Sequence, residues 1–450
     1  MIDAAGAGPG RRDLAGRLSV MSWLRERRVA LAAVTLFVLL AGDAVRYPLT
    51  WYGWGAIIAV LAVCWIALAV RARLSWRGVP IALALFVGLA VLSIVWSAYR
   101  LETAIGSGLL VLTALGGAVM ARTLTLEQVV RALGVALRWI IGLSLVFELA
   151  VATVIRQPVL PWWTDYEGEI PLAFFWSRNE LFEVLDGGRI QGIVGNANLL
   201  GFAALLAIIV FTIQLVDHRV GQAAGYGWLA AAALTFVCAG SATMIVAAAV
   251  VAIVLVLLVV ARRLGARARI RLLLVSAAAG VTALALVVVF RDALLELLGR
   301  SGDLTNRVDI WAAVTELALE RPWFGWGWVS YWAPWVEPFD GLVLIKGVEY
   351  LQAHNALLDV WLQLGFAGVA VFSVLVVTML LRAVSWAVDA PLGDIVDSPA
   401  LRLLPALIAT VLLVQSLAES RILIEGGLLL LVWLAVASRT HGRALSGIGR

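Results

Sequence analysis

Three side chains that could bind or activate a substrate lie in polar stretches of an otherwise apolar chain: Arg189, Arg307 and His354. An imidazole titrates near neutral pH, so His354 could take a proton from a hydroxyl group as a general base. A guanidinium beside a helix N-terminus binds phosphate oxygens well. Two guanidiniums and one imidazole in a single cleft would therefore suit a diphosphate donor and a hydroxyl acceptor.

Each of these residues also has a simpler explanation. His354 could be a loop histidine bound to backbone, and Arg189 could reach lipid phosphates as interface arginines do. Arg307 follows a cap-forming cluster and is expected in the first turn of a helix, where the macrodipole disfavours a cation. Asp303 or Asp309 could compensate its charge, and so could a bound phosphate.

Further polar residues are candidates for the same site. Asn198 lies in "GNANLLG" (195–201), which is predicted to open a helix, and Asn355 directly follows His354. Glu419, in "LAESRILIEGG", is either an ion partner for one of the arginines or a plain loop acid.

An acidic stretch raises the question of a metal. Asp165, Glu167 and Glu169 alternate in "DYEGE" and could hold a divalent cation. The stretch is flanked by Trp and Pro, and no Asp-X-Asp pair occurs elsewhere in the loops expected to face outside the membrane. A solvated loop is therefore the preferred interpretation, and we predict no metal and no cofactor.

The elements that must position these residues follow from composition. Of 450 residues, 63% are hydrophobic and only 14% are charged, and the mean hydropathy is +0.99. Such values exclude an ordinary soluble protein and predict an all-α polytopic membrane protein. About 12 apolar spans of membrane length occur, near 29–46, 52–70, 79–98, 103–121, 133–155, 195–216, 224–240, 243–261, 272–290, 357–381, 403–418 and 426–438.

Arginine placement predicts the orientation of these spans. Arginine-rich loops at 71–77 and 262–271 are expected in the cytoplasm, because positive residues stay inside. Both termini then face the cytoplasm, and two long loops near 156–194 and 291–356 face outside. The expected divisions are a cytoplasmic segment 1–28, one transmembrane domain 29–438 and a cytoplasmic tail 439–450.

The second outer loop contains a further helix signal. In "VDIWAAVTELALE" (308–320), apolar residues recur at helical spacing, and Pro322 with the glycines after it should end the helix. We expect short amphipathic helices in these loops, lying on the outer membrane interface. The net charge of +5 is scattered over short loops, so it does not indicate nucleic-acid binding.

Three motifs in this order resemble the O-antigen ligase and polymerase superfamily. They are an outer-loop arginine before "GNANLLG", then "NRVDIWAAVTELALERPWFGWG", then "AHNALLDVWLQLGFAG". The resemblance covers roughly residues 185–380. Two departures stand out: Arg300 matches no motif position, and "GSATM" (240–244) lacks the arginine that often follows its serine.

The resemblance implies a metal-independent, inverting glycosyltransferase at the outer face of the cytoplasmic membrane. Its donor would be a glycan on a polyprenyl diphosphate, and its acceptor a hydroxyl of a glycan or glycolipid. His354 would be the base, with Asn355, Asn198 and Glu419 in support. The residues expected to bind the donor diphosphate are Arg189, Arg307 and Arg300.

Two other functions compete with this one. A transporter or flippase of lipid-linked glycan would carry charges near the middle of the membrane. Here Asp43, Arg138 and Glu148 come nearest to that, and each lies close to a helix end. A silent scaffold for other envelope enzymes would tolerate the loss of His354.

Overall fold

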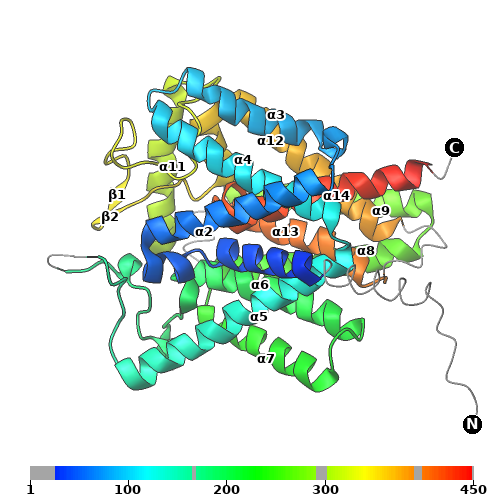
Figure 1. The fold of residues 1–450 in the computed structure, drawn as a ribbon, viewed down its shortest axis with the longest axis horizontal. Coiled ribbons are helices and arrows are strands. Elements are labelled where there is room, and N and C mark those ends of the chain that lie inside the picture. The colour runs from blue at the N-terminus through cyan, green and yellow to red at the C-terminus, as the bar shows by residue number, and fades with distance from the viewer. Residues whose placement is uncertain (1–25, 165–168, 290–301, 390–397, 448–450) are drawn as a thin grey trace, which may run out of the picture.

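Helices make up most of the computed structural model, which describes residues 26–164, 169–289, 302–389 and 398–447 (Figure 1). Residues 26–40 are helical. The helices that follow are α2 (Asp43–Arg71), α3 (Ile81–Leu92), α4 (Arg100–Thr123), α5 (Leu126–Ala150), α6 (Ala197–Val216), α7 (Gln222–Ala239), α8 (Ala242–Arg263), α9 (Ala266–Val289), α11 (Gly302–Glu320), α12 (Ala356–Val388), α13 (Leu404–Ser416) and α14 (Glu425–Gly447). Strands β1 (Leu344–Ile345) and β2 (Val348–Glu349) form a small antiparallel hairpin.

The apolar character of the helices supports an all-α polytopic membrane protein. Within the described residues, seven helices are long and apolar enough to cross a membrane: α2, α4, α5 with its extension to Ile155, α6, α7, α8 and α12. Two apolar helices, Ile81–Val95 and Leu401–Ser416, are shorter. The count of twelve spans therefore stays a prediction.

The long helices pack side by side around one apolar core. Helix α12 packs against α3, α13 and α14, and α6 packs against α5 and α7. Helix α13 also contacts α8, and α4 contacts α14. Since lipid is itself apolar, close packing rather than water exclusion must hold such helices together.

A break in α12 explains the glycine-rich motif after α11. Gly365 has φ 63°, and the backbone groups freed there bind the segment 322–327. Phe366 N donates to Pro322 O at 2.8 Å, and Gly327 N donates to Gln363 O at 2.9 Å. A Cβ on Gly365 would lie 2.2 Å from the carbonyl carbon of Trp323, so glycine is required there. Non-helical backbone is tolerated because every freed group finds a protein partner.

Helix α11 confirms the predicted helix over 308–320 and corrects two details. It begins at Gly302, so Arg307 lies in the second turn and not the first. Its apolar face, with Ile310 and Val314, packs into a second core formed with Trp332 and Phe339. That face is therefore covered by protein and is not free to lie on a membrane interface.

The first outer loop is tied to the end of α5. Glu148 is buried and accepts hydrogen bonds from Ser177 Oγ at 2.7 Å, from Gln191 N at 2.9 Å and from Gly192 N at 2.6 Å. The described residues of this loop form short 3₁₀ turns, including Leu181–Asp186, in place of the amphipathic helices expected there. The buried acid fixes the loop that carries Arg189.

Several helices meet at one end of the molecule, which we call the site end. Helices α6, α8 and α12 begin there, and their N-caps are Asn196, Ser241 and Asn355. The 22 residues of α8 cover about 33 Å and end at Arg262 and Arg263. Arg262 Nε in turn donates to Ala387 O, near the end of α12, at 2.6 Å. The arginine-rich loop 262–271 thus lies about one membrane thickness from the site end.

Candidate active site

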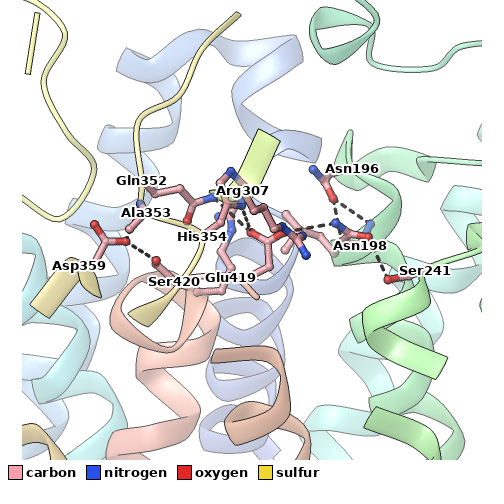
Figure 2. A network of polar contacts seen from close by, with 12 residues as sticks. Asn196, Asn198, Ser241, Arg307, Gln352, Ala353, His354, Asp359, Glu419 and Ser420 are labelled. Carbon is pink, nitrogen blue, oxygen red and sulfur yellow. Dashed lines mark hydrogen bonds and ion pairs between the residues drawn. The ribbon is translucent and has the colours of Figure 1, made fainter. Parts of the chain in front are cut away.

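The carboxylate of Glu419 joins side chains from distant parts of the chain (Figure 2). Glu419 follows α13 and is buried. Its Oε2 lies 2.9 Å from His354 Nδ1 and accepts from Gln352 Nε2 at 3.3 Å. Its Oε1 accepts from Asn198 Nδ2 at 3.2 Å and lies 3.6 Å from Arg307 Nη2. Of the two interpretations of Glu419, the ion partner is the one the structure bears out.

The start of α12 sets the position of His354. Asn355 is the N-cap, and its Oδ1 accepts from Leu357 N at 3.0 Å and from Leu358 N at 3.3 Å. His354, just before the cap, has φ 50°, a conformation that side-chain-bearing residues seldom adopt. This backbone turns the imidazole toward Glu419. Its side chain is 18% exposed, so a substrate can reach it.

Asp359, one turn into α12, holds the two residues that flank this pair. It is buried, and its Oδ2 accepts from Ala353 N at 2.9 Å and from Ser420 Oγ. Its Oδ1 accepts from Trp332 Nε1 at 2.9 Å. Ala353 precedes His354 and Ser420 follows Glu419, so one carboxylate ties together the two segments that carry the pair. Sequence reasoning missed this residue, although an acid inside an apolar helix was the signal that could have found it.

Arg189 reaches the same network through an amide. Its Nη2 donates to Asn198 Oδ1 at 2.9 Å, and its Nε donates to Ala239 O, at the end of α7, at 3.0 Å. Ser241 Oγ also donates to Asn198 Oδ1 at 2.9 Å. Asn198 therefore connects Arg189 and Ser241 to Glu419. The segment "GSATM" (240–244), which lacks the arginine of the family motif, therefore contributes Ser241 to this network.

The electrostatics of the site follow from the buried carboxylate. Burial alone would raise the pKa of Glu419, but the charge and hydrogen bond of His354 lower it, as do the charges of Arg307 and Arg421, to about 2. Glu419 is therefore ionised at neutral pH.

The imidazole is oriented for proton transfer. With Glu419 ionised, Nδ1 carries the hydrogen and donates it to Oε2, which fixes the tautomer. Among the described residues Nε2 makes no hydrogen bond, so this nitrogen can accept one from a substrate hydroxyl. A base held by a carboxylate is the arrangement that activates hydroxyl groups in many enzymes.

Other candidate residues fall outside this cluster. Arg300, Asp165 and Glu167 lie outside the described residues, and Glu169 is exposed. In the described part of the chain, no three His, Cys, Asp or Glu side chains gather to form a metal site. The structure thus brings together His354, Glu419, Arg307, Asn198 and Arg189, while Asn355 acts as a helix cap.

Comparison with known proteins identifies the central part of the chain. Residues 227–373 match the protein family described as O-antigen ligase. The matched region contains Arg307, His354 and Asp359, while Arg189 and Glu419 lie on either side of it. No curated protein matches the chain. The match confirms the resemblance indicated by the motifs: over residues 227–373, this integral membrane protein is similar to the O-antigen ligase family.

Proposed function

We propose that the protein transfers a glycan from a polyprenyl diphosphate donor to an acceptor hydroxyl. The observation that carries this proposal is the contact of Glu419 with both His354 and Arg307. One carboxylate thereby sets a proton acceptor beside a phosphate-binding group. Few functions other than group transfer from a phosphate ester to a hydroxyl require that pair.

In the proposed reaction, Nε2 of His354 removes the proton from the acceptor hydroxyl. The acceptor oxygen attacks the anomeric carbon and forms the new glycosidic bond, while the bond from that carbon to the diphosphate oxygen breaks. Attack opposite to the leaving group inverts the anomeric centre. The proton ends on the imidazole, beside the ionised Glu419, and the polyprenyl diphosphate leaves as an anion.

Arg307 and Arg189 stabilise the charge that grows on the leaving diphosphate. Each charge-assisted hydrogen bond contributes about 1.5–3 kcal/mol, so the two guanidiniums can replace a metal ion in this role. The positive ends of helix dipoles add to them, since α6 and α12 begin at the site end. The proposed reaction is therefore metal-independent.

The proposed location is the outer face of a bacterial cytoplasmic membrane. Support comes from the arginines of 262–271, which lie at the opposite end of α8 from Ser241. On this proposal residues 1–28 and 439–450 are cytoplasmic, and 29–438 form one transmembrane domain with external loops near 156–194 and 291–356.

The charges that suggested a transporter have structural partners. Glu148 binds the first outer loop, Asp43 pairs with Arg46 at 2.7 Å, and Arg138 Nη2 donates to Gln214 Oε1 at 2.5 Å. Each of these three side chains is therefore engaged with a partner inside the protein. This favours the enzyme over the transporter or flippase.

Reconstitution tests the proposal directly. Purified protein in liposomes should transfer glycan from lipid-linked donor to acceptor, and His354→Asn protein should not. Wild-type protein that moves the donor across the bilayer without forming a glycosidic bond would overturn the proposal in favour of the flippase. Lipid-linked glycans of a deletion strain then distinguish two enzymes: long chains accumulate without a ligase, and single repeats without a polymerase.

A further inference from the structure

A cavity lies at the site end, apart from His354 and Glu419. It has a volume of about 190 Å³ and is formed by the start of α2 and by the first outer loop. A water molecule occupies about 30 Å³ in the liquid, so this cavity is far too large for one or two waters. Four aromatic side chains line it: Tyr47, Trp51, Trp163 and Phe174.

The wall of this cavity is fixed by hydrogen bonds. Trp163 Nε1 donates to Tyr47 O at 3.1 Å and to Arg46 O at 3.3 Å. Trp162, the next residue in the loop, donates from Nε1 to Pro48 O at 3.1 Å. Tyr47 also makes an edge-to-face contact with Trp176, with ring centroids 5.4 Å apart. The cavity is therefore a defined part of the fold.

The floor of the cavity is polar but nearly neutral. Arg46 is buried there, between Asp43 at 2.7 Å and Glu425 at 2.5 Å. Its guanidinium lies 4.8 Å from the ring centroid of Trp51. Of the described residues that line the cavity, only Asp43 and Arg46 are charged, and their charges cancel.

This composition discriminates between ligands. A diphosphate would find its only cation already matched by two carboxylates, so an anion is disfavoured. A lipid tail would bury the Asp43–Arg46 pair without giving either residue a hydrogen bond. A sugar ring meets both requirements, because its C–H faces stack on aromatic rings while its hydroxyls bond with carboxylate and guanidinium.

The cavity is linked to the candidate active site through Arg421. This residue follows Glu419 by two positions, and its Nη1 donates to Glu425 Oε2 at 3.0 Å. Asp43 and Arg46 also line a neighbouring space that includes Arg421 and Leu199. Leu199 directly follows Asn198, which binds Glu419. Residues around the cavity are thus neighbours in the sequence of Glu419 and of Asn198, which binds it.

We infer that this aromatic cavity binds a pyranose ring of the glycan that is joined at His354. The inference rests on the proposed function and adds a glycan subsite to it. The ring could belong to the donor glycan or to the acceptor, and the chemistry of recognition is the same for both. Transfer kinetics distinguish the two sources.

The test uses Phe174→Leu and Trp51→Leu, which remove a ring face but keep the surface apolar. Phe182→Leu is the matched control, because this exposed ring lies on the same loop but does not line the cavity. Loss of one aromatic contact should raise one KM about fivefold to tenfold, with kcat within about twofold. A rise in the KM for donor assigns the ring to the donor, and a rise in the KM for acceptor assigns it to the acceptor.

A binding measurement separates this inference from the proposed function. The probe is the free oligosaccharide released from the lipid-linked donor by mild acid, with the free acceptor glycan tested in parallel. Calorimetry should show binding of one of them to wild-type and Phe182→Leu protein, and weaker binding to Phe174→Leu protein. Equal binding by all three proteins, or unchanged KM values in both cavity variants, would overturn the subsite while transfer by the wild type still stood.

Discussion

The imidazole Nδ1 of His354 lies 2.9 Å from Oε2 of Glu419, although 65 positions separate the two residues in the chain. This contact gives the imidazole one tautomer and one orientation, and it leaves the other ring nitrogen for a substrate. The same carboxylate lies 3.6 Å from Arg307. On the proposed function, proton acceptance and phosphate binding are therefore coupled through a single residue.

Replacement of His354 should stop transfer without preventing donor binding. His354→Asn is the sharper variant than His354→Ala, because asparagine tolerates the φ of 50° found there. The transfer rate should fall by on the order of 10² or more, since the base is lost. Transfer kinetics and equilibrium donor binding on the same purified protein check this. Normal transfer would make His354 a loop histidine, and lost donor binding would make it a diphosphate ligand.

Glu419→Gln should change how stability depends on pH. The pKa of Glu419 is about 2 in the folded protein against an ordinary 4.5, so the ionised carboxylate stabilises the fold above pH 4.5. That contribution, about 3 kcal/mol, is lost as the pH falls from 4.5 toward 2. Wild-type protein should therefore melt at a higher temperature than Glu419→Gln at pH 7, and the difference should shrink below pH 4.5. A constant difference from pH 7 to pH 3 would contradict the assigned ion network.

Arg307→Lys should not be a conservative change. Lysine keeps the charge but loses the forked donors that match phosphate oxygens, so transfer should fall at least about tenfold while expression is retained. The control is Arg156→Lys, at an exposed arginine whose Nε donates only to Thr153 O. Wild-type turnover by the Arg307 variant would remove this residue from the donor site.

Asp359→Asn should lower kcat without altering the KM for donor. An amide has one acceptor oxygen, so it cannot accept from Ala353 N and Ser420 Oγ on one side and from Trp332 Nε1 on the other, as the carboxylate does. His354 and Glu419 would therefore lose part of their common anchor. We expect a fall of about tenfold, because small displacements of a base are costly. Ser420→Ala removes only one of these bonds and should have a smaller effect. A rise in donor KM at unchanged kcat would indicate a role in binding instead.

Chelation should leave transfer nearly unchanged. The residues around Glu419 include a guanidinium and an imidazole, and these suit a phosphate without a metal ion. Activity measured with and without EDTA checks this expectation. If activity were lost and then restored by Mg²⁺ or Mn²⁺, attention would return to Asp165, Glu167 and Glu169.

Local patterns predicted the helices better than their irregularities. Apolar runs indicated the helices, and Pro322 correctly indicated where α11 ends, at Glu320. The break at Gly365 was not predictable, because it exists only where the segment 322–327 supplies hydrogen bonds. The buried face of α11 was interpreted as a membrane face for a similar reason: sequence shows which side is apolar but not what covers it.

The candidate site, like the helices, was predictable only in part. His354, Arg307 and Arg189 could be selected by chemical type and by their places at helix starts, but Glu419 had two open interpretations. Its role depends on contacts with residues up to 221 positions away, which no local pattern contains. Asp359 was missed because it binds Ala353 N and Ser420 Oγ, which are next to His354 and Glu419 in the chain, and does not bind those two side chains themselves.

The order of the chain gives the Glu419 contacts a consequence for biosynthesis. A ribosome makes Asn198, Arg307 and His354 before it makes Glu419, which joins all three. Until the segment after α13 emerges, the imidazole and the guanidinium have no common carboxylate, and the base is not oriented. On the proposed function, a nascent or prematurely terminated chain would therefore be inserted in the membrane without consuming substrate, and activity would begin only after the segment that follows α13 has been made.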